Sequence, residues 1–80
     1  MSKVVLITGA TSGMGALTSE FLAKNGYVVY AGTRNKDNLE SSNASIKPIY
    51  IDVTKTQSIK SAVKQIIEKE GRIDVLVNNA

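Results

Sequence analysis

The stretch that decides the fold spans residues 4–15 and reads Val4-Val5-Leu6-Ile7-Thr8-Gly9-Ala10-Thr11-Ser12-Gly13-Met14-Gly15. It opens with a short, β-branched apolar run, which is typical of a strand buried on both faces of a parallel sheet. Three glycines follow, and a helical spacing of apolar residues begins among them at Met14. A glycine-rich turn between a strand and a helix offers an anion free backbone N–H groups and the positive end of the helix dipole. The stretch therefore predicts a strand, a phosphate-binding turn and a helix.

Each glycine of this turn has a physical reason to be there. Gly9 lets the chain leave the strand through φ angles that other residues resist. Gly13 lacks the Cβ that would keep a pyrophosphate away from the first N–H groups of the helix, and Gly15 lets the helix pack closely on the sheet. The hydroxyls of Thr11 and Ser12 are expected to add hydrogen bonds to phosphate or ribose. No Gly-Lys-Ser/Thr follows the turn, which excludes a P-loop nucleoside triphosphatase.

Three further apolar runs have the length and composition of strands, at residues 27–31, 48–51 and 73–77. Pro48 is expected to open its run, because a proline inside a central strand removes a hydrogen bond from the ladder.

Segments with helical spacing lie between these runs. The first predicted helix has apolar or neutral side chains on one face and is ended by Asn25-Gly26; the face is formed by Met14, Leu17, Thr18, Phe21 and Leu22. The last has the same spacing in Ile59, Ala62, Val63, Ile66 and Ile67. Thr54 and Gln57 predict a capping box at its start, and Gly71 is placed to end it. Residues 35–43 predict only a short helix, with Leu39 as its apolar anchor.

The order β-α-β-α-β-α-β predicts an α/β fold, a partial Rossmann (doubly wound) parallel sheet with strand order 3-2-1-4. Eighty residues is less than a typical domain of about 100–150 residues. Residues 1–80 are therefore expected to be one incomplete domain, the N-terminal part of a larger one. The single helix on the second face would leave part of that face bare and strand 73–77 as an apolar edge.

Composition excludes several classes of protein. The chain has no Cys and no His, which excludes a disulfide scaffold, a zinc site and a Ser-His-Asp triad. The net charge of +3 comes from dispersed lysines, so a nucleic-acid partner is not expected. The apolar runs are too short for a membrane span or a signal peptide, and the expected location is cytoplasmic.

Three motifs together resemble those of the short-chain dehydrogenase/reductase family, of its smaller single-domain type. They are the Thr-Gly-x-x-x-Gly-x-Gly spacing of Thr8–Gly15, the pair Asp52-Val53 after the third strand, and Asn78-Asn79-Ala80 after the fourth. The resemblance implies an oxidoreductase that interconverts a small-molecule carbonyl and alcohol by hydride transfer with a nicotinamide cofactor. Members of the family are commonly homodimers or homotetramers.

The resemblance also implies roles for individual residues. Asp52 and Val53 resemble the pair that contacts adenine, and Asn79 and Ala80 resemble residues on the adenosine-ribose side. In the turn, the implied cofactor-binding residues are Gly9, Thr11, Ser12, Gly13, Met14 and Gly15. Thr8 is expected to orient the turn and Asn78 to tie the strand end to its neighbours, whereas Asp52 has the alternative role of capping a helix that begins near Thr54.

The end of the second strand favours NADP(H) over NAD(H). An acidic residue there binds the ribose 2′-hydroxyl of NAD, and a basic one accommodates the 2′-phosphate of NADP. This chain has Arg34 and Lys36 there and no acidic residue before Asp37. A guanidinium offers a planar, bidentate fork to a phosphate.

No catalytic residue is identified within the chain. The family uses a Tyr with a Lys four residues later, together with a Ser and an Asn. None of the tyrosines in this sequence is followed by such a lysine; they are Tyr27, Tyr30 and Tyr50. The catalytic Ser, Tyr, Lys and Asn are therefore expected beyond residue 80, and the 80 residues alone are expected to be inactive.

Three alternative classes of protein also have a glycine-rich turn after their first strand. A non-catalytic dinucleotide-sensing regulator would differ only after Ala80. An extended-type relative usually has Thr-Gly-x-x-Gly-x-x-Gly, and Ser12 occupies its second-glycine position here. An S-adenosylmethionine methyltransferase normally has an acidic residue where this chain reads Gly32-Thr33-Arg34.

Overall fold

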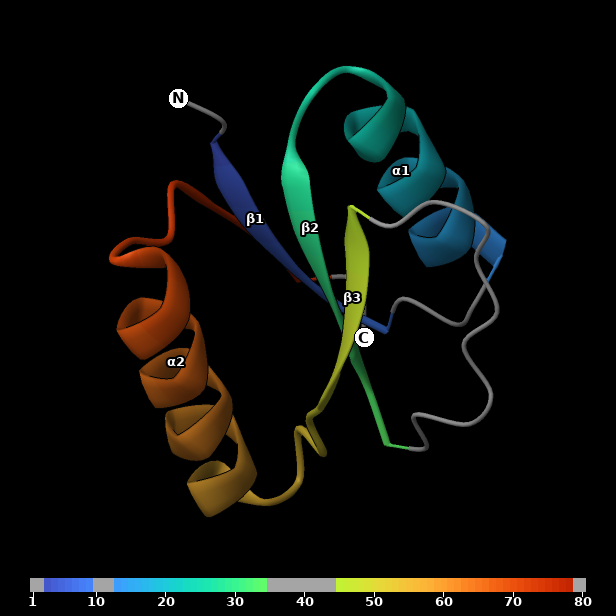
Figure 1. The fold of residues 1–80 in the computed structure, drawn as a ribbon. Coiled ribbons are helices and arrows are strands. Elements are labelled where there is room, and N and C mark those ends of the chain that lie inside the picture. Colours follow the sequence, from blue (N-terminus) through green and yellow to red (C-terminus); the bar gives the residue numbers. More distant parts are fainter. Residues whose placement is uncertain (1–2, 10–12, 35–44, 79–80) are drawn as a thin grey trace.

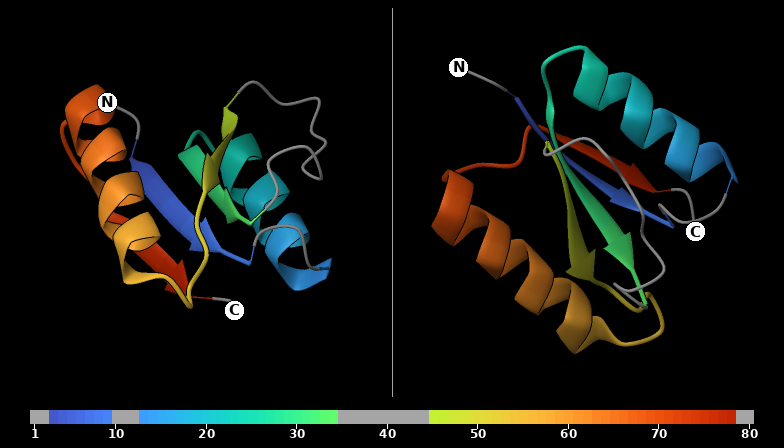
Figure 2. Two further views of the ribbon diagram at one scale, coloured as in Figure 1. Left: turned by 90° about the horizontal axis from the view of Figure 1, so that it is seen from below. Right: turned by 45° about the vertical axis from the view of Figure 1, so that its right-hand side comes forward.

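A four-stranded parallel sheet lies between two helices (Figures 1 and 2). The computed structural model describes residues 3–9, 13–34 and 45–78. The strands are β1 (Val4–Thr8), β2 (Val28–Thr33), β3 (Ile46–Tyr50) and β4 (Val75–Asn78), and the helices are α1 (Gly13–Lys24) and α2 (Thr56–Glu70). The sheet order β3-β2-β1-β4 confirms the predicted order 3-2-1-4. The short helix predicted at residues 35–43 lies outside the described residues.

The two faces of the sheet form separate apolar clusters, one under each helix. β1 contributes to both, because alternate residues of a strand point to opposite faces and all five of its residues are buried. The cluster on the α2 face consists of Val4, Leu6, Tyr30, Ile49, Ile51, Ala62 and Ile66. The cluster on the α1 face consists of Val5, Ile7, Ala23, Val29, Ala31 and Ile46.

Helix α1 was predicted correctly, but its buried face was predicted only in part. The residues against the sheet are small and recur every four positions: Gly15, Ser19 and Ala23. Small residues let the helix axis approach the sheet closely, and the Ser19 hydroxyl satisfies its hydrogen-bonding capacity by donating to Gly15 O at 2.9 Å. Of the predicted face, Leu22 is partly buried against the α1-face cluster, whereas Met14, Leu17 and Phe21 are 66–71% exposed. Gly26, with φ of 88°, follows the helix as predicted.

Pro48 lies in the middle of β3, so the prediction that it opens the strand was wrong. β3 is the edge strand of the described sheet and pairs with β2 along one side. Ser45 O accepts from Val29 N–H, and Ile51 N–H donates to Thr33 O, so the odd-numbered residues of β3 face β2. Because hydrogen-bonding groups alternate along a strand, the nitrogen of Pro48 faces away from β2, where an edge strand tolerates proline.

The predicted capping box at the start of α2 was also wrong. The N-cap is Lys55, without a side-chain capping bond, and the Thr54 hydroxyl donates to Asp52 instead. Gly71 ends the helix as predicted, with φ of 82° and its N–H donating to Ile67 O at 2.8 Å. Among the described residues, no helix is long and apolar enough to cross a membrane.

The part of the sheet beyond α2 is bare, as predicted. β4 pairs with β1 in parallel register, and Leu76 lies opposite Leu6 on the α2 face, yet Leu76 is 63% exposed. One helix is too narrow to cover four strands, so the side chains of β4 on this face meet solvent.

Tyr30 joins β2, β3 and α2 through polar contacts at the edge of the core. Its hydroxyl donates to Glu70 Oε2 at 2.6 Å, and Lys47 Nζ lies 3.4 Å from the same oxygen. The Lys47 ammonium also lies 5.7 Å from the centroid of the Tyr30 ring. Burial and the neighbouring Glu70 carboxylate raise the pKa of Tyr30 from 10.0 to about 12.

The raised pKa of Tyr30 predicts a loss of stability at alkaline pH. Because the folded pKa lies above the unfolded one, the stabilisation is complete below pH 10.0 and is lost as pH rises towards about 12. Replacement of Tyr30 by Phe should remove this dependence and lower stability at neutral pH by about 1–2 kcal/mol, through loss of a hydrogen bond to a charged acceptor. Urea unfolding between pH 7 and 11.5 measures both effects. Tyr27→Phe is the control, and an unchanged alkaline slope in Tyr30→Phe would contradict the prediction.

Candidate functional site

The carboxyl ends of the four parallel strands meet at one edge of the sheet, which is where ligands bind in open α/β folds (Figure 2, right). Thr8 at the end of β1 is in register with Gly32 of β2 and with Asn78 of β4. The residues that follow β1, β2 and β3 are Gly9, Arg34 and the segment 51–53, and helix α1 begins near the same edge. We call this edge the carboxyl edge.

The glycine turn at the carboxyl edge has the conformation that its sequence predicts at both described ends. Gly9 has φ of 65°, in the left-handed region that favours glycine. Gly13 is the first residue of α1, and Gly15 is buried against the sheet. Met14, between them, is 71% exposed. Thr11 and Ser12 were predicted to bind phosphate or ribose and lie outside the described residues.

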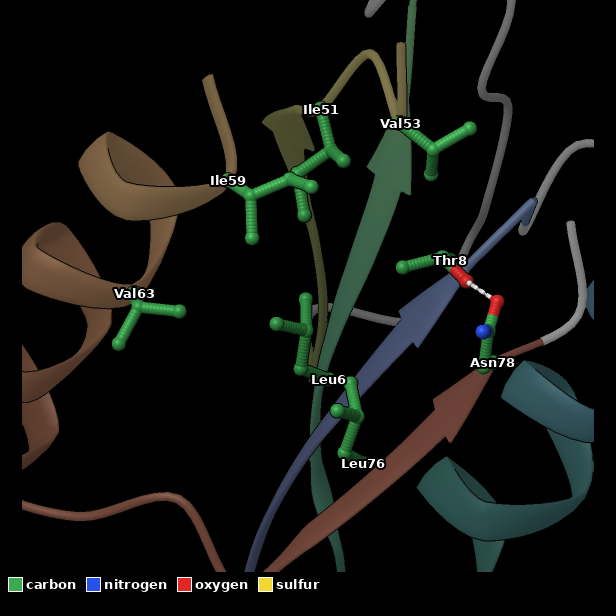
Figure 3. A pocket seen from close by; sticks show the side chains of 8 residues that line it. All are labelled: Leu6, Thr8, Ile51, Val53, Ile59, Val63, Leu76 and Asn78. Carbon is green, nitrogen blue, oxygen red and sulfur yellow. Dashed lines mark hydrogen bonds between the residues drawn. The ribbon is translucent and has the colours of Figure 1, made fainter. Parts of the chain in front are cut away.

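A side-chain hydrogen bond joins the carboxyl ends of β1 and β4. The Thr8 hydroxyl donates to Asn78 Oδ1 at 3.0 Å, as Figure 3 shows. This contact agrees with the predicted roles of both residues, since it ties the end of β4 to the residue from which the glycine turn departs. Asn79 and Ala80, predicted to lie near the ribose, are outside the described residues.

The end of β2 lies very close to residues of β1 and of the segment after β3, and it is followed by the cationic residue Arg34. A Cβ on Gly32 would lie 3.0 Å from Ile51 Cδ1 and 3.1 Å from the backbone oxygen of Ile7. Thr33 ends the strand and is buried, and Arg34 follows it and is exposed. The guanidinium therefore stands at the carboxyl edge, beyond the last residue of the ladder.

Asp52 begins a tight turn between β3 and α2. Its Oδ1 accepts from the Thr54 hydroxyl at 2.6 Å and from the Thr54 N–H at 3.0 Å. These hydrogen bonds hold the pKa of the Asp52 carboxyl below its ordinary value of 3.8, and the charges of Lys55 and Arg34 act in the same direction. Because α2 begins at Thr56, Asp52 orders the turn before the helix and does not cap it.

An apolar cavity of about 390 Å³ opens on the α2 face beside this turn (Figure 3). Ile59 and Val63 of α2 form one wall, and the sheet forms the other. Val53, which is 50% exposed, lies at the end near the carboxyl edge, as do Thr8 and Asn78. A flat apolar ring can lie in such a cavity, whereas a phosphate cannot, because the walls offer it few donors.

The comparison with known proteins agrees with this geometry. Residues 3–80 match the family described as short chain dehydrogenase. The chain belongs to the short-chain dehydrogenase family. A 3-ketodihydrosphingosine reductase of Bacteroides thetaiotaomicron is 42% identical over 98% of this chain and 28% of its own length. A 3-oxoacyl-acyl-carrier-protein reductase of Thermotoga maritima is 44% identical over 98% of this chain and 35% of its own length. The chain thus spans about a third of these relatives.

Solved structures of short-chain dehydrogenases have the same fold. One from Streptomyces avermitilis covers 100% of this chain and 31% of its own chain, with a TM-score of 0.91 and 33% identity. A variant actinorhodin polyketide ketoreductase with NADPH covers 99% and 33%, with a TM-score of 0.89 and 34% identity. A 3-ketoacyl-(acyl-carrier-protein) reductase from Brucella melitensis complexed with NADH covers 92% and 32%, with a TM-score of 0.84 and 32% identity.

One residue at this edge was not predicted from the sequence. Ser58, in the first turn of α2, is buried, and its hydroxyl contacts the backbone of Asp52. A serine near the start of a helix is common, so only its contact with a loop that precedes the helix distinguishes it.

Loss of the Thr8 hydroxyl is predicted to loosen the end of β4. Thr8→Val keeps the shape of the side chain but removes the donor to Asn78, which should lower the free energy of unfolding by about 1 kcal/mol. Hydrogen exchange of the amides of residues 75–78 should rise more than that of β2 amides. The matched control is Thr18→Val, whose hydroxyl donates to Met14 O on an exposed helix surface. Unchanged exchange in β4 would contradict the role of the Thr8–Asn78 bond.

Proposed function

We propose that this chain is the adenosine- and pyrophosphate-binding part of an NADP(H)-dependent oxidoreductase that interconverts a small-molecule carbonyl and alcohol. The supporting observation is that one sheet edge brings together a helix N-terminus, a guanidinium and a carboxylate, from α1, Arg34 and Asp52. These groups match, in order, a pyrophosphate, a ribose phosphate and an adenine amine. The relatives above are named as reductases, in agreement with this chemistry.

The glycine turn would hold the pyrophosphate. The left-handed Gly9 directs the chain away from β1, and Gly13 starts α1, so the first N–H groups of the helix are free of intrahelical partners. The proposed contacts in this turn are made by Gly9, Thr11, Ser12, Gly13, Met14 and Gly15.

Arg34 would select NADP(H) over NAD(H). Similar structures include one with NADPH and one with NADH, so family membership alone does not decide the cofactor. Arg34 is exposed at the end of β2, and the neighbouring Thr33 carries no carboxylate that would repel a phosphate. A guanidinium makes two parallel hydrogen bonds to phosphate oxygens, which supports NADP(H).

Asp52 and Val53 would hold the adenine. The Asp52 carboxylate accepts from the exocyclic amine, and Val53 gives the ring an apolar surface at the edge of the cavity. Asn79 and Ala80 would line the adenosine-ribose side of the pocket.

The nicotinamide ring supplies the hydride when the cofactor is bound. The residues of this chain bind the adenosine half and orient the dinucleotide, and they exchange no proton with the substrate. The proposed Ser, Tyr, Lys and Asn of the reaction, and the surfaces of a homodimer or homotetramer, belong to a longer protein.

Replacement of Arg34 tests the choice of cofactor. In the full-length protein, Arg34→Ala should weaken NADPH binding about 10–100-fold, the loss of a charge-assisted bidentate contact, and leave NADH binding within about twofold. The NADPH affinity of Arg34→Lys should lie between those of the wild type and Arg34→Ala, since an ammonium keeps the charge but has no planar fork. Fluorescence titration with both dinucleotides measures the affinities.

The matched control is Lys24→Ala, because Lys24 is exposed at the far end of α1 and carries the same charge. Its NADPH affinity should not change. Equal NADPH affinity in the wild type and Arg34→Ala would overturn the assignment to NADP(H).

The proposed location of the catalytic residues outside residues 1–80 leads to a second prediction. Residues 1–80 alone should not oxidise NADPH in the presence of small ketones or 3-oxoacyl thioesters, because no proton donor of the reaction lies among them. The full-length protein should oxidise NADPH with at least one such carbonyl compound. Absorbance at 340 nm measures both rates, and turnover by the 80 residues would contradict the proposal.

A further inference from the structure

The Ser58 hydroxyl forms hydrogen bonds with both the N–H and the carbonyl oxygen of the Asp52 backbone. The hydroxyl accepts from the Asp52 N–H at 2.9 Å. The hydroxyl proton is shared between the carbonyl oxygens of Asp52 and Lys55, each 2.8 Å away. Ser58 is only 8% exposed. The Ser58 hydroxyl thus uses both its donor and an acceptor lone pair in hydrogen bonds with the turn that joins β3 to α2.

The bond to the Asp52 N–H replaces a partner that β2 cannot supply. Ile51 N–H donates to Thr33 O of β2 at 2.9 Å. Successive N–H groups of a strand point to opposite sides, so the N–H of Asp52 points away from β2. An N–H without a partner in a half-buried position is unfavourable. The Ser58 oxygen satisfies it and sets the direction in which the chain leaves β3.

The Asp52 carboxylate is oriented on this fixed backbone. Thr54 donates two hydrogen bonds to Oδ1, from its hydroxyl and its N–H. Among the described residues none donates to the other oxygen, Oδ2, which leaves it for a ligand donor. Because the same hydrogen bonds lower the pKa of the carboxyl, it is ionised at neutral pH and acts as an acceptor.

We infer that Ser58 is a positioning residue for adenine recognition, which fixes the backbone of Asp52 and thereby directs Oδ2 towards the exocyclic amine of the base. The inference rests on the proposed contact between Asp52 and adenine. Ser58 acts through Asp52 and does not contact the dinucleotide, because its hydroxyl is already used by the backbone of the turn. Its loss should therefore affect recognition of the base rather than binding of the phosphates.

The test compares NADPH with its deamino analogue, in which hypoxanthine replaces adenine and a carbonyl replaces the amine. In the full-length protein, a charged acceptor at Asp52 should favour NADPH by roughly tenfold or more. Ser58→Ala should reduce this preference to about twofold or less, mainly by weakening NADPH. A partly unfolded variant lowers both apparent affinities equally, so the ratio of the two dissociation constants reports positioning and not stability.

Two further variants keep the outcomes distinct. Ser61→Ala removes a serine hydroxyl from the exposed side of α2, where, among the described residues, its oxygen accepts from Gln65, and should keep the full preference. Ser58→Cys keeps the shape of the side chain but replaces the hydroxyl by a larger, weakly accepting thiol, and it should reduce the preference if Ser58→Ala does not fold.

Asp52→Asn separates this inference from the proposed function. If Asp52→Asn loses the preference for NADPH but the Ser58 variants keep it, the positioning role of Ser58 is overturned and the adenine contact of Asp52 stands. Retention of the preference in Asp52→Asn would overturn the adenine contact and, with it, the inference about Ser58. Loss of the preference in both, with Ser61→Ala unaffected, supports the inference.

Discussion

The rest of the structure depends on the parallel pairing of β1 with β2 on one side and β4 on the other. β1 begins with the apolar run of residues 4–7, and all residues of the strand are buried. The strand serves both clusters of the core, and its ladder brings residue 78 next to residue 8. Contacts this distant in sequence carry a large entropic cost, and a strand that is covered by helices on both faces and paired on both edges offsets it with buried apolar surface and satisfied backbone groups.

The same pairing builds the carboxyl edge. Parallel strands end together, so polar residues that follow separate strands gather although the sequence keeps them apart. Arg34 and Asp52 are close enough for the guanidinium to lower the pKa of the carboxyl. The buried strands hold the apolar residues, and the candidate site residues follow the point where each ladder stops. The stability of the core and the placement of the site are therefore consequences of one register.

The sequence predicts this fold well where a pattern has a single physical explanation. A glycine turn between an apolar strand and a helix is one such pattern, and Gly9 and Gly71 have the left-handed φ that their positions required. The errors occurred where two explanations compete. Pro48 is compatible with the start of a strand or with the outward side of an edge strand, and only the pairing of β3 decides between them. Helix α1 has one large apolar face and one face of small residues, and close approach to the sheet favoured the small face.

The sequence by itself determined the order of the described elements, the glycine turn after β1 and the cation at the end of β2, because local patterns and short motifs encode them. Only the tertiary structure decided which helix face is buried, which oxygen of Asp52 is held by Thr54, and that Ser58 bonds the backbone before its own helix. The physical reason is that hydrogen-bond geometry depends on the positions of groups in space. Ser58 and Ser61 both lie on α2, yet one is buried against the turn and the other faces solvent, and the packing of α2 on the sheet makes that difference.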